Sequence, residues 1–269
     1  MHSIKFLLRK KMNKLISLSS FAILALFLNT GCTQHNENIE HTSAHHTHWG
    51  YEGEVSPTHW ASLNEKFAMC SNGNMQSPIN IVATQDINIK PLKFNYKTNS
   101  NDVINNGHTV QVNIKSGSSV VIDGESYELK QFHFHTPSEN NINGNQYPLE
   151  AHFVHSTKDG KLAVVAVMFE YGKENPVLNK IWSKFPLKLN HKEILTLSAN
   201  DINAILPNNK DYYKFMGSLT TPPCSQNVKW NVFKTSISIS KEQVKKFFDV
   251  FEHTNNRPLQ KTNNRVIYK

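Results

Sequence analysis

Long apolar stretches are scarce in this chain of 269 residues. The main one, residues 15–28, is too short for a comfortable transmembrane helix. It follows a cluster of basic side chains made of Lys5, Arg9, Lys10, Lys11 and Lys14. A basic head followed by a short apolar body is typical of a secretory signal, so we expect residues 1–32 to be a signal peptide.

A strong charge of one sign is also missing once this segment is set aside. The chain has 29 Lys and Arg residues against 21 Asp and Glu residues, a formal charge of +8. Five of the basic residues and none of the acidic ones lie in residues 1–32, which leaves 24 against 21, or +3. A net charge so close to zero does not imply a nucleic-acid partner, and we expect none.

Cysteines are few, and the three present differ in context. Gly31-Cys32 follows the apolar run and is similar to a bacterial lipoprotein processing site, although Asn29 stands where leucine is usual. Two outcomes stay open: acylation of Cys32, with anchoring to the cell envelope, or ordinary cleavage nearby and a free periplasmic protein. In both, Cys70 and Cys224 remain in an oxidising compartment, where a disulfide is expected.

No internal repeat and no linker divides the remainder, so one domain over residues 48–269 is expected. Residues 33–47 are polar and have little to bury, which predicts a flexible tether. This tether and its junction carry a histidine cluster, namely His41, His45, His46 and His48. A solvated linker is the plain interpretation, and a metal-scavenging arm is the alternative.

Short runs rich in aromatic or β-branched residues predict strands over residues 108–114, 119–122, 127–135, 149–155 and 162–169. Turn signals such as Asp123-Gly124 favour antiparallel neighbours. Residues 162–169 have no polar face, as expected of a central strand covered on both sides. Helices are expected to be few: the clearest is at residues 240–252, with Ser240 as N-cap and Gln243 completing a capping box, and a shorter one is at residues 176–185. The fold class is therefore mostly β with short helices (α+β).

Histidines recur at strand spacing in Gln131-Phe132-His133-Phe134-His135 and again at His152. Because successive side chains of a strand point to opposite faces, His133 and His135 share one face. A turn-rich connection could return the chain beside them and bring His152 as a third ligand. Three histidines leave one tetrahedral position open, which is typical of catalytic zinc. Gln131 and Glu150 each precede a histidine by two residues and could bond its second ring nitrogen.

Eight ordered motifs over residues 48–268 resemble the alpha-class carbonic anhydrases of bacteria. They are Trp49-Gly50-Tyr51, Gln76-Ser77-Pro78-Ile79-Asn80-Ile81, Asn105-Asn106-Gly107-His108, Gln131-Phe132-His133-Phe134-His135, Pro137-Ser138-Glu139, Leu149-Glu150-Ala151-His152-Phe153-Val154-His155, Gly217-Ser218-Leu219-Thr220-Thr221-Pro222-Pro223-Cys224 and Asn256-Arg257-Pro258-Leu259-Gln260. The resemblance implies a single domain with a large, twisted, mainly antiparallel sheet of about ten strands and a conical cleft. It also implies that one Zn²⁺ per chain lies at the foot of that cleft.

The resemblance assigns a role to each site residue. His133, His135 and His152 would bind zinc, with Gln131, Glu150 and the carbonyl of Asn255 as their hydrogen-bond partners. Thr220 would orient the nucleophile and donate to an ionised Glu139, and His108 would be the proton shuttle. The side chains beside the substrate would be Val154, Val164, Leu219, Thr220, Thr221 and Trp230.

The implied activity is the reversible hydration of carbon dioxide to bicarbonate and a proton, by a lyase (carbonate dehydratase) with weak ester hydrolysis as a side activity. Sulfonamides and anions are the implied inhibitors, and a homodimer is frequent among bacterial members. The chain departs from the family at Asn140, where histidine is common, at Phe215, where tyrosine is common, and at Asn256, where tryptophan is frequent. Two rival functions stay open: a binding module on this fold, and a zinc-carrying lipoprotein that uses the histidine cluster.

Overall fold

The computed structural model describes residues 48–185 and 187–269. The expected signal peptide, Cys32, the tether at residues 33–47 and the first three members of the histidine cluster lie outside the described residues. None of the helices within the described ranges has the length and apolar character needed to cross a bilayer.

Strands predominate in the described part of the chain. They are β1 (Asn80–Ile81), β2 (Lys93–Asn95), β3 (Ser100–Asn105), β4 (Val110–Ile114), β5 (Ser119–Ile122), β6 (Glu125–His135), β7 (Asn141–Ile142), β8 (Leu149–Ser156), β9 (Leu162–Tyr171), β10 (Lys192–Ile194), β11 (Tyr212–Ser218), β12 (Gln226–Phe233) and β13 (Ile237–Ile239). The helices are short: η1 (Gly53–Val55), α1 (Trp60–Leu63), η2 (Glu65–Phe67), α2 (Met69–Asn72), α3 (Pro176–Trp182), α4 (Ala199–Ala204) and α5 (Lys241–Phe248).

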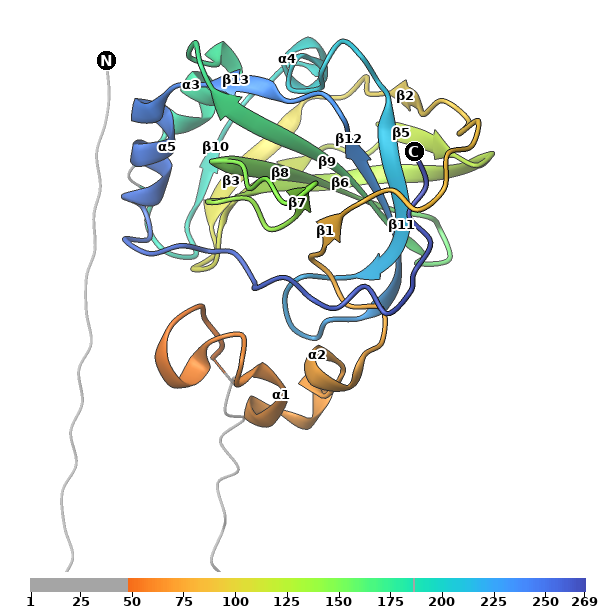
Figure 1. The fold of residues 1–269 in the computed structure, drawn as a ribbon. Coiled ribbons are helices and arrows are strands. Elements are labelled where there is room, and N and C mark those ends of the chain that lie inside the picture. Colours follow the sequence, from red (N-terminus) through yellow and green to blue (C-terminus); the bar gives the residue numbers. More distant parts are fainter. Residues whose placement is uncertain (1–47, 186) are drawn as a thin grey trace, which may run out of the picture. The chain divides into compact units, whose positions relative to one another are not determined.

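Across residues 48–185 and 187–269, eleven strands form one sheet with β6, β8 and β9 near its middle (Figure 1). Its main path runs β10-β3-β4-β6-β8-β9-β12-β11, while β5 pairs with β6, β2 with β5 and β13 with β9. β12 and β13 run parallel to β9, and the other pairs of this sheet are antiparallel. The expected sheet of about ten mainly antiparallel strands is thereby confirmed.

Strand β9 is buried on both faces, as its uniformly apolar sequence indicates. Val165 and Val167 belong to the main hydrophobic core, whereas the alternate residues Val164, Ala166 and Met168 belong to a second apolar cluster. These two clusters occupy opposite faces of the sheet, because neighbouring residues of a strand point in opposite directions. The second cluster is the one that borders the candidate site.

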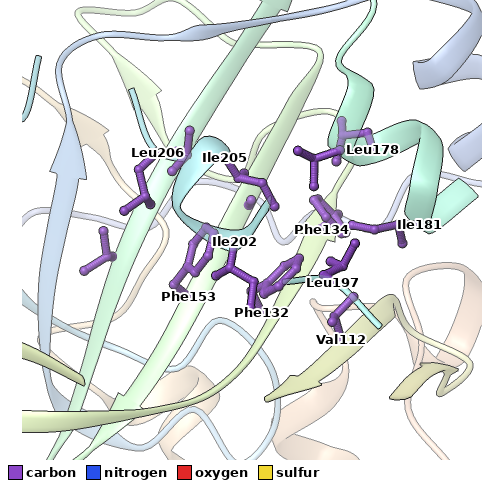
Figure 2. Close-up of a cluster of buried hydrophobic side chains, with 14 of the residues drawn as sticks. Val112, Phe132, Phe134, Phe153, Leu178, Ile181, Leu197, Ile202, Ile205 and Leu206 are labelled. Atoms are coloured by element: carbon purple, nitrogen blue, oxygen red, sulfur yellow. The ribbon is translucent and has the colours of Figure 1, made fainter. Parts of the chain in front are cut away.

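The main core fixes the back of the site. Phe132, Phe134 and Phe153 are completely buried there, and they lie on the opposite face of β6 and β8 from the candidate ligand histidines. Figure 2 shows side chains of α3 and α4, such as Ile181 and Ile202, packed over them. Burying a phenylalanine side chain contributes roughly 1.5–3 kcal/mol, so the strands that carry the histidines are anchored from behind.

The two predicted helices begin where the sequence predicts and end sooner. Ser240 caps α5 and Gln243 completes the capping box. The helix stops at Phe248 and not at residue 252, because the next turn tightens and Glu252 takes a left-handed φ of 60°. Phe251 still packs on the core from this turn. Helix α3 likewise ends at Trp182, three residues before the expected end.

One expected strand also begins late, with a consequence for the site. β4 starts at Val110 and not at residue 108, because Asn106 Oδ1 accepts the backbone N–H groups of His108 (3.0 Å) and Thr109 (2.9 Å). Gly107 supplies the φ of +86° that this turn requires. His108 therefore lies in a tight turn between β3 and β4, outside the sheet ladder.

Candidate metal centre

Three histidines meet on one face of the sheet. β6 and β8 pair antiparallel with His133 directly opposite His152, and His135 follows two residues along the same face. The ring centroids lie 5.4 Å apart for His133 and His152, 5.1 Å for His133 and His135, and 4.7 Å for His135 and His152. One nitrogen from each ring lies within 4.8 Å of the others. The grouping predicted from sequence spacing is therefore present.

The remaining ring nitrogens have partners that orient the imidazoles. His133 Nδ1 lies 2.8 Å from Gln131 Oε1, and His135 Nδ1 lies 2.6 Å from the carbonyl oxygen of Asn255. A carbonyl oxygen only accepts, so the ring nitrogen must carry the proton and Nε2 keeps its lone pair.

The third imidazole is turned the other way. His152 Nε2 lies 2.9 Å from Glu150 Oε1, although the contact lacks the alignment of a regular hydrogen bond. A carboxylate at this distance favours the proton on Nε2 and leaves the lone pair on Nδ1. Gln131, Glu150 and Asn255 each place an oxygen beside one of the three rings, while their role as partners of metal ligands stays a prediction.

The electrostatics suit a divalent cation with a preference for nitrogen ligands. Burial lowers the pKa of His133 and of His152 well below the usual value, and it lowers the pKa of His135 to about 4. The rings are therefore neutral near pH 7, the form in which imidazole binds zinc. His135 Nε2 is buried and has no hydrogen-bond partner, which is costly unless an ion engages it. The donor set fits zinc.

Glu139 lies beside the three rings and is fully buried. Its Oε2 is 3.4 Å from His135 Nε2, and its Oε1 accepts the backbone N–H of Arg257 at 2.9 Å. Burial raises the pKa of this carboxyl to about 8, against the lowering effects of the Arg257 N–H and of the Thr220 hydroxyl. Glu139 Oε2 has no regular hydrogen bond, so the expected donation from the Thr220 hydroxyl stays a prediction. A dication beside such a carboxyl favours its ionised form.

Glu150 is held by the residue at which the sequence departs from the family pattern. Its Oε2 accepts the backbone N–H groups of Glu139 (2.8 Å) and Asn140 (2.9 Å), and its Oε1 accepts Asn140 Nδ2 (2.8 Å). Asn140 Oδ1 also accepts the backbone N–H of Ile79 at 3.0 Å. Burial raises the pKa of Glu150 to about 7. The asparagine therefore supplies a side-chain donor to Glu150 at this position.

The expected apolar wall is assembled beside His152. Trp230 makes an edge-on contact with the His152 ring at 5.0 Å between centroids. Val164 shares the second apolar cluster with Trp230, and Val154 and Leu219 pack against it. Phe215, the second departure, stacks on Trp230 at 6.0 Å. The lost tyrosine hydroxyl is replaced there by apolar packing.

A cavity of about 120 Å³ reaches two of the candidate metal ligands and the expected shuttle. Its lining includes His133, His135, His108 and Thr221, but not the four residues of the apolar wall. Trp49 and Tyr51 also line it, and sequence reasoning gave neither a role. The motif that contains them was the available signal.

The expected disulfide joins Cys70, on α2, to Cys224, in the loop after Thr220, with an S–S distance of 2.06 Å. Arg257, for which sequence reasoning predicts no role, connects this link to the site. Its guanidinium donates to the carbonyl oxygens of Cys70 (2.7 Å) and Ser77 (2.7 Å) and to Gln76 Oε1 (2.9 Å). The loop that carries Thr220 is thus cross-linked to the N-terminal part of the domain.

Comparisons with known proteins agree with this geometry. The family model described as eukaryotic-type carbonic anhydrase matches residues 55–269. The chain is 45% identical over 220 residues to a carbonic anhydrase from Pectobacterium atrosepticum, and 47% identical over 223 residues to one from Klebsiella pneumoniae. Each alignment covers 82% of this chain and 90% of the relative.

Among solved structures, the complex of alpha-carbonic anhydrase from Thermovibrio ammonificans with the inhibitor sulfanilamide superposes with a TM-score of 0.80 at 45% identity. That match covers 83% of this chain and 99% of the other. The sequence motifs, the sheet and the three-histidine site agree with these matches. The chain therefore belongs to the eukaryotic-type, or alpha-class, carbonic anhydrase family.

Proposed function

We propose that this protein is a zinc-dependent enzyme that reversibly hydrates carbon dioxide to bicarbonate and a proton. The observation that carries the proposal is the convergence of three neutral imidazole nitrogens, on His133, His135 and His152, beside a cavity lined by His133, His135 and His108. A zinc ion held there would activate water by lowering its pKa to about 7, a value established for carbonic anhydrases themselves.

The chain's own residues supply orientation and substrate contact. The Thr220 hydroxyl orients the nucleophile, and its single proton is directed to Glu139, which makes the lone pairs of the hydroxyl available on the other side. Trp230 and its apolar neighbours offer a wall for a linear, uncharged substrate. His108 passes the product proton outward, because an imidazole ring can accept a proton on one nitrogen and release it again.

The decisive experiment combines metal counting with stopped-flow hydration of carbon dioxide by the full chain. We expect one zinc per chain, activity that a chelator removes and zinc restores, and inhibition by sulfanilamide. His135→Ala should lose most of the zinc and nearly all of the activity, whereas His59→Ala, at an exposed position in the N-terminal segment, should keep both. Full activity of His135→Ala with one bound zinc would contradict the proposal.

The same measurements separate the rival functions. A binding module would not hydrate carbon dioxide, whether or not it binds zinc. A zinc carrier would hold additional, exchangeable zinc on the histidine cluster at residues 41–48. Each result differs from one tightly held ion with activity.

We also propose that the protein is exported, either free in the periplasm or anchored through Cys32. The basic and apolar composition of residues 1–32 and the Cys70–Cys224 disulfide support export. Cell fractionation followed by mass spectrometry of the mature N-terminus tests this. A protein that begins at an acylated Cys32 is anchored, and an unmodified N-terminus further along indicates the free form.

A further inference from the structure

Two hollows in the described structure share a wall at His108. The inner hollow is the cavity of about 120 Å³ that contains His133 and His135. The outer hollow, of about 640 Å³, contains two further histidines, His48 and His253. Trp49, Asn106 and His108 line both. A group that leaves the metal site by way of His108 therefore enters a space that already holds other bases.

His108 is held in a way that hinders it from keeping a proton. Its ring stacks on Trp49 with 3.6 Å between centroids and 8° between planes, and its Nδ1 is buried without a hydrogen-bond partner. Burial, together with repulsion from His48 and His253, lowers the pKa of His108 to about 4. At neutral pH the protonated ring is a minor species, so onward transfer depends on an acceptor close by.

His253 presents such an acceptor. Its Nδ1 lies 2.9 Å from the carbonyl oxygen of Thr254, which can only accept, so Nδ1 carries the proton and the lone pair is on Nε2. The ring is placed by Tyr51 and Phe251, each 6.2 Å away between centroids. The side chain is partly exposed, which gives a proton on it access to solvent.

The rest of the outer hollow suits proton passage. Its lining has no carboxylate that would trap a proton, and its volume is ample for bridging water. His48 lies on the same hollow, with its ring 6.0 Å from that of His108.

We propose that His253 is a second proton-transfer residue, which receives the proton from His108 in the outer hollow and releases it to buffer. In this step an N–H bond of protonated His108 breaks, the proton passes through water to Nε2 of His253, and a buffer base then removes it. Both rings return to the neutral state. The inference rests on the proposed carbon dioxide hydration.

The test uses the zinc-loaded full chain. His253→Phe keeps a ring against Tyr51 and removes the base, and His59→Phe is the matched control at an exposed histidine outside both hollows. At low buffer concentration we expect His253→Phe to lower kcat several-fold and leave kcat/KM unchanged, because proton release limits only kcat. Imidazole buffer should restore kcat. In a His108→Ala background, His253→Phe should have no further effect, since the two residues act in series.

Three results overturn the assignment: an unchanged kcat at low buffer, an equal loss in kcat/KM, or an additional loss in the His108→Ala background. A loss in His48→Phe but not in His253→Phe would place the role on the other histidine and overturn it as well. Failure of the proposed function is distinguishable, because the unmodified protein would then show no hydration before any variant is compared.

Discussion

The backbone N–H of Arg257 donates to Glu139 Oε1 at 2.9 Å, while the guanidinium of the same residue donates to the Cys70 carbonyl oxygen at 2.7 Å. One buried residue therefore links the carboxyl beside the metal ligands to the disulfide segment. An arginine fork can satisfy several acceptors at fixed angles, which a lysine cannot.

Arg257→Lys should destabilise the protein and weaken catalysis. Leaving buried acceptors unpaired costs about 1–3 kcal/mol each. Displacement of the residue 257 backbone should also move the Glu139 carboxyl that it holds, and this should lower kcat/KM. Denaturant unfolding and stopped-flow hydration measure the two effects. Arg265→Lys is the control, because this guanidinium also bonds backbone carbonyls, such as that of Gln76, but has no contact with Glu139. Equal activity losses in the two variants would contradict a special role for Arg257.

Removal of the disulfide should lower stability and loosen the Thr220 loop. For a closed loop of more than 100 residues the chain-entropy model gives about 5 kcal/mol, as an upper figure. Cys70→Ser with Cys224→Ser should therefore melt at a markedly lower temperature and lose part of its activity where it stays folded. Mass spectrometry of non-reduced peptides from the native compartment is the companion measurement. Unlinked cysteines there would contradict the prediction.

Asn140→Ala should weaken zinc binding. The substitution removes the amide donor to Glu150 Oε1 and leaves the Ile79 N–H without its acceptor. Loss of an outer partner of a metal ligand typically costs about 10–100-fold in metal affinity or activity. Competition with a zinc indicator measures the affinity. Asn141→Ala, at the next residue, lacks the contact with Glu150 and should bind zinc like the unmodified protein.

The pH dependence of stability should reveal His155. Burial lowers the pKa of this histidine to about 3 from 6.5, and its Nε2 lies 2.6 Å from the Tyr96 hydroxyl. Between these values the unfolded chain binds the extra proton, so the contribution of His155 is complete above pH 6.5 and is lost as the pH falls toward 3.

The measurement compares metal-free wild type with His155→Phe by denaturant unfolding from pH 7 to pH 4. Glu139 and Glu150, whose pKa values are raised to about 8 and about 7, act in the opposite sense but are common to both proteins. We expect a smaller loss of unfolding free energy on acidification in His155→Phe. Parallel curves for the two proteins would contradict this.

The parts of the site that lie within one or two strands follow from the sequence. Alternation places His133 and His135 on one face, and the turn-rich connection brings His152 opposite His133. The same reasoning identifies β9 as a strand covered on both faces. These features depend on the pattern and hydrogen bonding of residues close together in the chain, so a short stretch of sequence is enough to predict them.

Contacts across the fold were not accessible in this way. Asn255 reaches His135 over 120 residues and Arg257 reaches Cys70 over 187, and only the family resemblance pointed to the first. The end of α5 is predicted too far along the chain and the start of β4 two residues too early. A left-handed residue in the first case and an Asn106 side-chain hydrogen bond in the second interrupt patterns that otherwise continue. Whether a pattern is interrupted in this way depends on single torsion angles, which hydrophobic periodicity does not predict.

The pairing of His133 with His152 also bears on how the chain selects its fold. Because side chains alternate, a slip of β6 by one residue against β8 would turn Phe132 and Phe134 toward the cleft and the histidines into the apolar core. Only the native alignment can bind zinc through all three rings, so zinc stabilises that alignment and no shifted one. Bound zinc would then favour the native register of β6 and β8 over shifted registers. A chain that folds in a zinc-poor medium would lack this stabilisation of the native register.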